Sequence, residues 1–172
     1  MTVKRMFHLI SLAAILTTAC KTRPVPAPAP AAAPVPAPAP APAEGPLTLQ
    51  DRLAREAASR PSGVISAEAV AAALSDAGVP VGALKQVLAR PVGARYCALA
   101  RTAAGLVVSV CEFEDDAGAV RGVDLSRRTF DRLIPGRRLT HRRGTLLTLT
   151  VGAPDTRRAA EAARAETVFA AL

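Results

Sequence analysis

The chain has 172 residues, with 22 lysine and arginine residues against 14 aspartate and glutamate residues, which gives a formal net charge of +8. This length accommodates one domain of ordinary size. Only 3% of the residues are aromatic, which argues against a stacking surface for nucleic acid. The basic residues are scattered along the chain, so the net charge alone does not establish a polyanionic partner.

The first twenty residues have the three-part layout of an export signal. Lys4 and Arg5 precede an apolar stretch at residues 6–19, and small residues lead from that stretch to Cys20. The stretch is shorter than the ~20 residues that a membrane-spanning helix needs. We therefore expect residues 1–19 to be a signal peptide that is removed.

The end of this segment resembles the lipobox of bacterial lipoproteins, because Ala19 and Cys20 match its last two positions. Thr17 departs from the pattern, since the family usually has leucine there. The resemblance implies acylation of Cys20, cleavage before it and anchoring in a membrane. Lys21 follows the cysteine, which in Gram-negative members implies the outer membrane, facing the periplasm or the cell surface. A soluble secreted protein cut near Ala19 is the alternative.

Residues 20–46 form a linker rich in proline and alanine. Ten of the 15 prolines of the chain lie in the 23 residues from Pro24 to Pro46. Alternating proline prevents both helix and sheet and favours extended polyproline II, which would span up to ~70 Å. We interpret the segment as a spacer, with a proline-rich ligand for a partner groove as the alternative.

Residues 47–172 are expected to form a small α+β domain. Thr48 and Asp51 have the spacing of a capping box before a first helix, and Ser66 is placed to cap a second one. The apolar stretch 81–88 is expected to be a third short helix, which ends before Pro91.

Two strands, 94–101 and 106–113, are predicted to form a hairpin around Ala103, Ala104 and Gly105. Cys97 and Cys111 are equally distant from Ala104, so the hairpin places them opposite each other. We expect a disulfide between them, which suits an exported chain. A reactive or metal-binding thiol pair is the alternative.

A similar unit follows 39 residues later, with a second hairpin turning at residues 142–144. Asp116 and Asp155 are expected to cap the helices that follow the two hairpins. Gly118 and Gly122 are expected to weaken the first of these helices and to split it near Asp124. The expected fold is therefore a four-stranded antiparallel sheet made from two ββα repeats, with the helices packed on one face.

Few residues suggest chemistry. His141 lies among arginines at a hairpin end and is interpreted as a solvated turn residue. The acidic run from Glu112 to Asp116 lacks the spacing of a calcium loop and is interpreted as helix capping. The sequence shows no catalytic set, phosphate loop or metal-spaced histidine pair, so we expect neither an enzyme nor a bound metal or cofactor.

An arginine cluster is the candidate binding surface for an anionic glycan, peptide carboxylates or lipid headgroups. Its members are Arg127, Arg128, Arg132, Arg137, Arg138, Arg142 and Arg143. The expected function is that of a lipid-anchored envelope protein, structural or interactive, that recognises another envelope protein or peptidoglycan. A periplasmic module that binds or senses a small ligand, in a pocket between sheet and helices, is the alternative.

Overall fold

The structure is a computed structural model that describes residues 46–172. The expected signal peptide, Cys20 and all but the last residue of the expected linker lie outside the described residues. In chain order the elements are α1 (Leu49–Ala58), α2 (Ala67–Asp76), β1 (Lys85–Val87), the 3-10 helix η1 (Arg90–Val92), β2 (Tyr96–Arg101), β3 (Val107–Glu112), α3 (Asp116–Phe130), β4 (Arg137–Arg142), β5 (Thr145–Thr150) and α4 (Thr156–Ala171).

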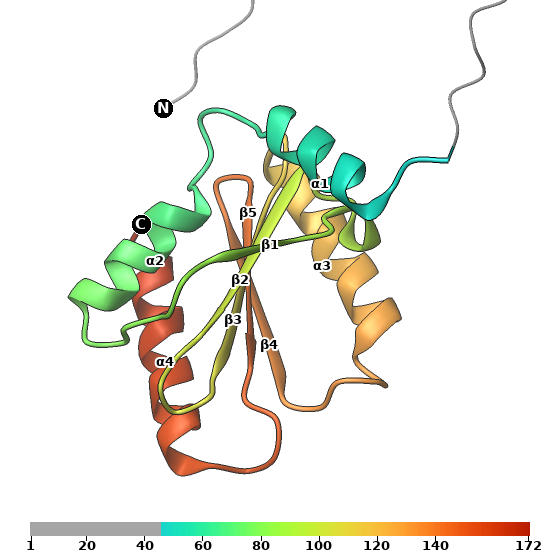
Figure 1. The fold of residues 1–172 in the computed structure, drawn as a ribbon. Helices are drawn as coiled ribbons and strands as arrows, with labels where there is room; N and C mark the ends of the chain where they lie inside the picture. Colours follow the sequence, from blue (N-terminus) through green and yellow to red (C-terminus); the bar gives the residue numbers. More distant parts are fainter. Residues whose placement is uncertain (1–45) are drawn as a thin grey trace, which may run out of the picture. The chain divides into compact units, whose positions relative to one another are not determined.

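The described part of the chain is an α+β domain, as predicted, but its antiparallel sheet has five strands and not four (Figure 1). The strand order is β1-β2-β3-β5-β4. The additional strand, β1, falls in the stretch 81–88 that was predicted to be a helix, so this prediction was wrong. Val87 pairs with Cys97, and Lys85 pairs with Leu99. A three-residue segment is extended here because the backbone of β2 supplies its hydrogen-bond partners.

The first hairpin has the predicted register. Cys97 lies opposite Cys111 and Arg101 lies opposite Val107. Gly105 has a positive φ of 84°, and its amide donates to the carbonyl of Thr102 over 2.9 Å. A glycine in the left-handed region therefore sets the turn, and the turn sets which residues face each other.

The second hairpin turns more tightly than predicted. Arg142 already pairs with Thr145, so only Arg143 and Gly144 form the turn. Both residues have positive φ, 46° for Arg143 and 73° for Gly144, as a type I′ turn requires. β5 also pairs with β3, which joins the two hairpins into one sheet.

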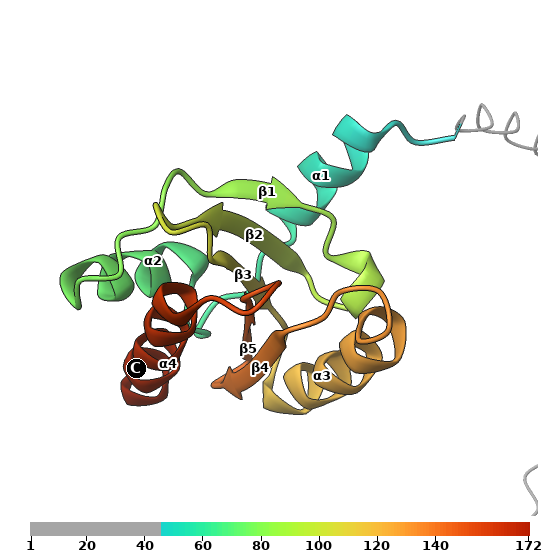
Figure 2. The ribbon, with the colours of Figure 1, turned by 90° about the horizontal axis from the view of Figure 1, so that it is seen from below.

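The helices cover both faces of the sheet, so the prediction that they pack on one face was wrong. α2 and α4 lie on one side, and α3 lies on the other (Figure 2). Two hydrophobic cores result: one places Val108, Val110 and Leu147 against α2 and α4, and the other places Cys111 and Leu146 against α3. The two ββα units are therefore not equivalent copies, because their helices are on opposite faces.

Side chains cap the helices close to the predicted positions. Thr48 and Asp51 form the capping box of α1, and Ser66 caps α2. Asp155 caps α4 as predicted, whereas Asp115 and not Asp116 caps α3, by accepting from the Gly118 amide over 2.6 Å. Each cap satisfies an amide that has no partner within its helix.

Candidate functional site

The candidate site is a groove on the sheet face that α3 covers. Residues paired across antiparallel strands point to the same face, so the register defines three rows. The cystine row is Cys97, Cys111 and Leu146; the hydroxyl row is Leu99, Ser109 and Thr148; the arginine row is Arg101, Val107, Thr150 and Arg137. All three rows line the groove.

The cystine row is closed by the predicted disulfide, which the structure confirms. The sulfur atoms of Cys97 and Cys111 are joined, and the two Cα atoms are 4.1 Å apart. Both residues are buried in the core under α3. The disulfide therefore ties the two strands together at the floor of the groove.

Two apolar walls stand above this floor. Val87, Leu88 and Pro91 of the β1–η1 segment form one wall, and Phe130 and Ile134 at the end of α3 and just beyond it form the other. The volume between them is about 450 Å³, which is within the range of small-molecule sites. The side chain of Ile134 is exposed although it is apolar. The groove thus offers an apolar surface that the described chain does not cover.

The polar groups at the floor have no partners within the described residues. No hydrogen bond joins the hydroxyls of Ser109, Thr148 or Thr150 to another side chain or to the backbone there, and these residues are half-buried. The exposed side chain of Arg101 likewise has neither an ion pair nor a hydrogen bond among residues 46–172. Each of these groups can therefore bind an external acceptor.

Unlike Arg101, Arg137 has a buried side chain and several partners in the described chain. Its side chain is only 5% exposed and donates to the Ser126 carbonyl over 3.1 Å and to Asp131 over 3.0 Å. It also donates to the Ser126 hydroxyl and lies 5.3 Å from the centre of the Phe130 ring. Burial lowers the pKa of this guanidinium, and the charge of Asp131 opposes that effect. Arg137 therefore holds the end of α3 against the sheet.

The structure distributes the predicted arginine cluster over several surfaces. Arg138 pairs with Glu166 of α4 over 3.2 Å. Arg142 and Arg143 donate to the carbonyls of Ala170 and Leu172 at the end of α4. The three members at the end of α3 are exposed and form no ion pair among the described residues, and these are Arg127, Arg128 and Arg132.

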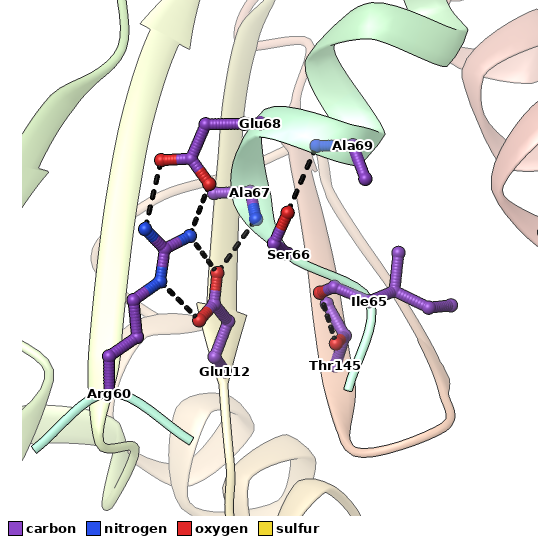
Figure 3. Close-up of polar contacts among 8 residues, drawn as sticks. All are labelled: Arg60, Ile65, Ser66, Ala67, Glu68, Ala69, Glu112 and Thr145. Atoms are coloured by element: carbon purple, nitrogen blue, oxygen red, sulfur yellow. Dashed lines mark hydrogen bonds and ion pairs between the residues drawn. The ribbon is translucent and has the colours of Figure 1, made fainter. Parts of the chain in front are cut away.

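A second polar cluster lies on the opposite face, at the start of α2 (Figure 3). Glu112 is fully buried and accepts from Arg60 Nε over 2.7 Å and from the Ala67 amide over 2.7 Å. Arg60 also pairs with Glu68 and lies 4.1 Å from the centre of the Tyr96 ring. The cluster uses both carboxylates to bind one guanidinium.

The charges of this cluster reinforce one another. Hydrogen bonds to Glu112 and then to Glu68 raise the pKa of Arg60, and the hydrogen bond from Arg60 lowers the pKa of Glu68. Burial raises the pKa of Tyr96. Because every charged group has a charged partner, the cluster fits a structural role in fixing α2.

The other predicted polar residues do not converge on a site. His141 is exposed, with Nδ1 3.9 Å from Asp116, and Glu114 pairs with Arg95 at the surface. Within residues 46–172, no three or more acidic, histidine or cysteine residues are placed to hold a metal ion. In the same range, every helix is too short or too polar to cross a bilayer.

Comparisons with protein-family models, with curated proteins and with solved structures give no match for this chain.

Arg101, Ser109 and Thr148 were not predicted from the sequence to be binding residues, although they line the groove. The signal was present in the hairpin register, which places Arg101 opposite Val107 and Leu99 opposite Ser109. Polar residues then follow the buried cystine on the same face. What the sequence did not show was that α3 and the β1–η1 segment would stand on either side of them.

Proposed function

We infer that this chain is a lipid-anchored binding protein of a bacterial cell envelope, and that it holds a small ligand in the groove between the end of α3 and the β1–η1 segment. Acylation of Cys20 attaches it to the outer membrane, and the proline-rich spacer holds the domain away from the lipid. The domain then acts on the periplasmic side or at the cell surface. This assignment takes up the ligand-binding alternative of the sequence analysis.

The observation that carries the proposal is the groove itself. It has a volume of about 450 Å³ between two apolar walls. Its hydroxyls and the Arg101 guanidinium have no hydrogen-bond partner among the described residues. Small-molecule sites have this composition, with apolar walls and a few polar groups that orient the ligand.

The test uses residues 46–172, which contain both hydrophobic cores and the disulfide. Titration with decanol, followed by amide chemical shifts in NMR, should give saturable changes at the hydroxyl row and at the walls. A matched variant, Ser109→Phe, should abolish these changes because the ring occupies the groove. Ser75→Phe, at an exposed position of α2 outside the groove, should leave these changes intact. The proposal would be contradicted if no amide shift changed at the highest decanol concentration, or if the changes lay on α2 and α4.

Recognition of peptidoglycan is the second candidate function. Arg127, Arg128 and Arg132 are exposed and form no ion pair among the described residues, so they can bind the carboxylates of peptide stems. Residues 46–172 should then sediment with purified peptidoglycan, and changing the three arginines to glutamine should release the domain. Equal sedimentation of both forms would remove this candidate.

A further inference from the structure

The groove has a direction, because its polarity changes from one end to the other. The cystine row is apolar and buried, the hydroxyl row carries Ser109 and Thr148, and the arginine row carries Arg101 and Arg137. Arg101 is four positions after Cys97, so the rows extend over ~14 Å along the strands. A ligand that matches this surface has an apolar body and a polar end.

The polar end of such a ligand must accept hydrogen bonds and carry a negative charge. Arg101 supplies a guanidinium with no counter-ion among the described residues, at the margin of the groove. Arg137, at the other margin of the same row, is already bound to Asp131 and Ser126. Lys85 pairs with Leu99 and shares this face of the sheet, but it does not line the groove. Arg101 is therefore the cation in the groove that a ligand would neutralise, and a carboxylate suits a guanidinium because two N–H groups can donate to it at once.

We propose that the groove binds an amphipathic carboxylate, with its hydrocarbon chain between the Leu88 and Phe130 walls and its carboxylate on Arg101. The hydroxyls of Ser109 and Thr148 lie in the row before Arg101, under the part of the hydrocarbon chain next to the carboxylate, so they can donate to the carboxylate from that side. This inference rests on the proposed function and specifies its ligand. The hydrocarbon chain of a neutral or cationic amphiphile can pack between the apolar walls, but its headgroup leaves Arg101 without a counter-ion.

The experiment compares three probes that share a ten-carbon chain, namely decanoate, decanol and decyltrimethylammonium, below their micelle concentrations. Calorimetric titration of residues 46–172 should give an affinity for decanoate about tenfold above that for decanol, since charge-assisted hydrogen bonds contribute on this order. The cationic probe should bind more weakly than decanol, because its headgroup meets Arg101.

Two variants assign the effect to one residue. Arg101→Gln should remove the preference for decanoate and leave decanol affinity within about twofold, whereas Arg101→Lys should retain most of the preference. Arg164→Gln removes the same charge from an exposed position on α4, on the other face of the sheet, and should change neither affinity. Thermal unfolding of each variant shows whether the domain remains folded.

The failures of the two proposals are distinguishable. If decanoate and decanol bind the groove equally, or if Arg101→Gln keeps the preference, the carboxylate proposal is overturned while the groove remains a binding site. If none of the three probes shifts the groove amides, both proposals are overturned.

Discussion

Glu112 attaches the start of α2 to the sheet through one carboxylate. Its side chain is 1% exposed and accepts from Arg60 and from the amide of Ala67, while Arg60 is also bound by Glu68. A buried carboxylate is costly unless it is paired and hydrogen-bonded, and here the guanidinium and the helix amide both donate to it. Removing the charge should therefore weaken the whole cluster.

We predict that Glu112→Gln lowers the free energy of unfolding by about 3 kcal/mol, because Arg60 loses its buried counter-ion. Urea denaturation of residues 46–172 measures the change. Glu114→Gln is the matched control, since Glu114 pairs with Arg95 at the surface and its loss should cost less than about 1 kcal/mol. Equal costs for the two variants would contradict the structural role of Glu112.

The role of Glu112 could be read from the sequence only in part. The hairpin register that pairs Cys97 with Cys111 also places Glu112 opposite Tyr96, inside the strand. The sequence analysis instead grouped it with the acidic run and assigned that run to helix capping. Its partner Arg60 lies 52 positions earlier in the chain, and no local pattern connects them.

Helix α3 packs closely on the end of β3 because of a glycine. A Cβ atom at Gly122 would lie 2.2 Å from Cζ of Phe113, which is closer than two carbon atoms can approach. From the sequence, Gly118 and Gly122 were expected to weaken this helix and to split it near Asp124, but α3 is continuous from Asp116 to Phe130. The close approach of the Phe113 ring is the reason for glycine at position 122.

Gly122→Ala should therefore destabilise the domain by about 2 kcal/mol, although alanine has the higher helix propensity. In a Phe113→Leu background the same change should cost less, because the ring that it meets is gone. Urea denaturation of the four proteins measures this coupling. An unchanged cost in both backgrounds would contradict the packing described here.

The sheet was predictable in register but not in its coverage by helices. A single glycine turn fixed which residues of β2 and β3 face each other, and this local signal was correct. Antiparallel sheets often have one face in solvent, and this led to the wrong prediction that the helices cover one face only. The pairs Val110–Cys111 and Leu146–Leu147 each place one buried apolar side chain on either face, which is the pattern of a sheet covered on both sides. β1 was not predicted because its three residues, Lys85–Val87, are too few to show the alternation of polar and apolar residues that indicates a strand.

The complete protein, as proposed, is a binding domain held at a membrane by a lipid on Cys20. Cys20→Ser should release it into the soluble fraction after membranes are sedimented, since no acyl chain can then be attached. Labelled palmitate should enter the wild-type protein and not the variant. Continued sedimentation of the variant would instead favour an uncleaved signal as the anchor.

The most direct measurement of the central claim is a crystal structure of residues 46–172 with decanoate. We expect the hydrocarbon chain between Leu88 and Phe130, above Thr148, with the carboxylate within hydrogen-bond distance of the Arg101 guanidinium. Decanoate bound elsewhere on the domain, or a groove without ligand at saturating concentration, would contradict the account.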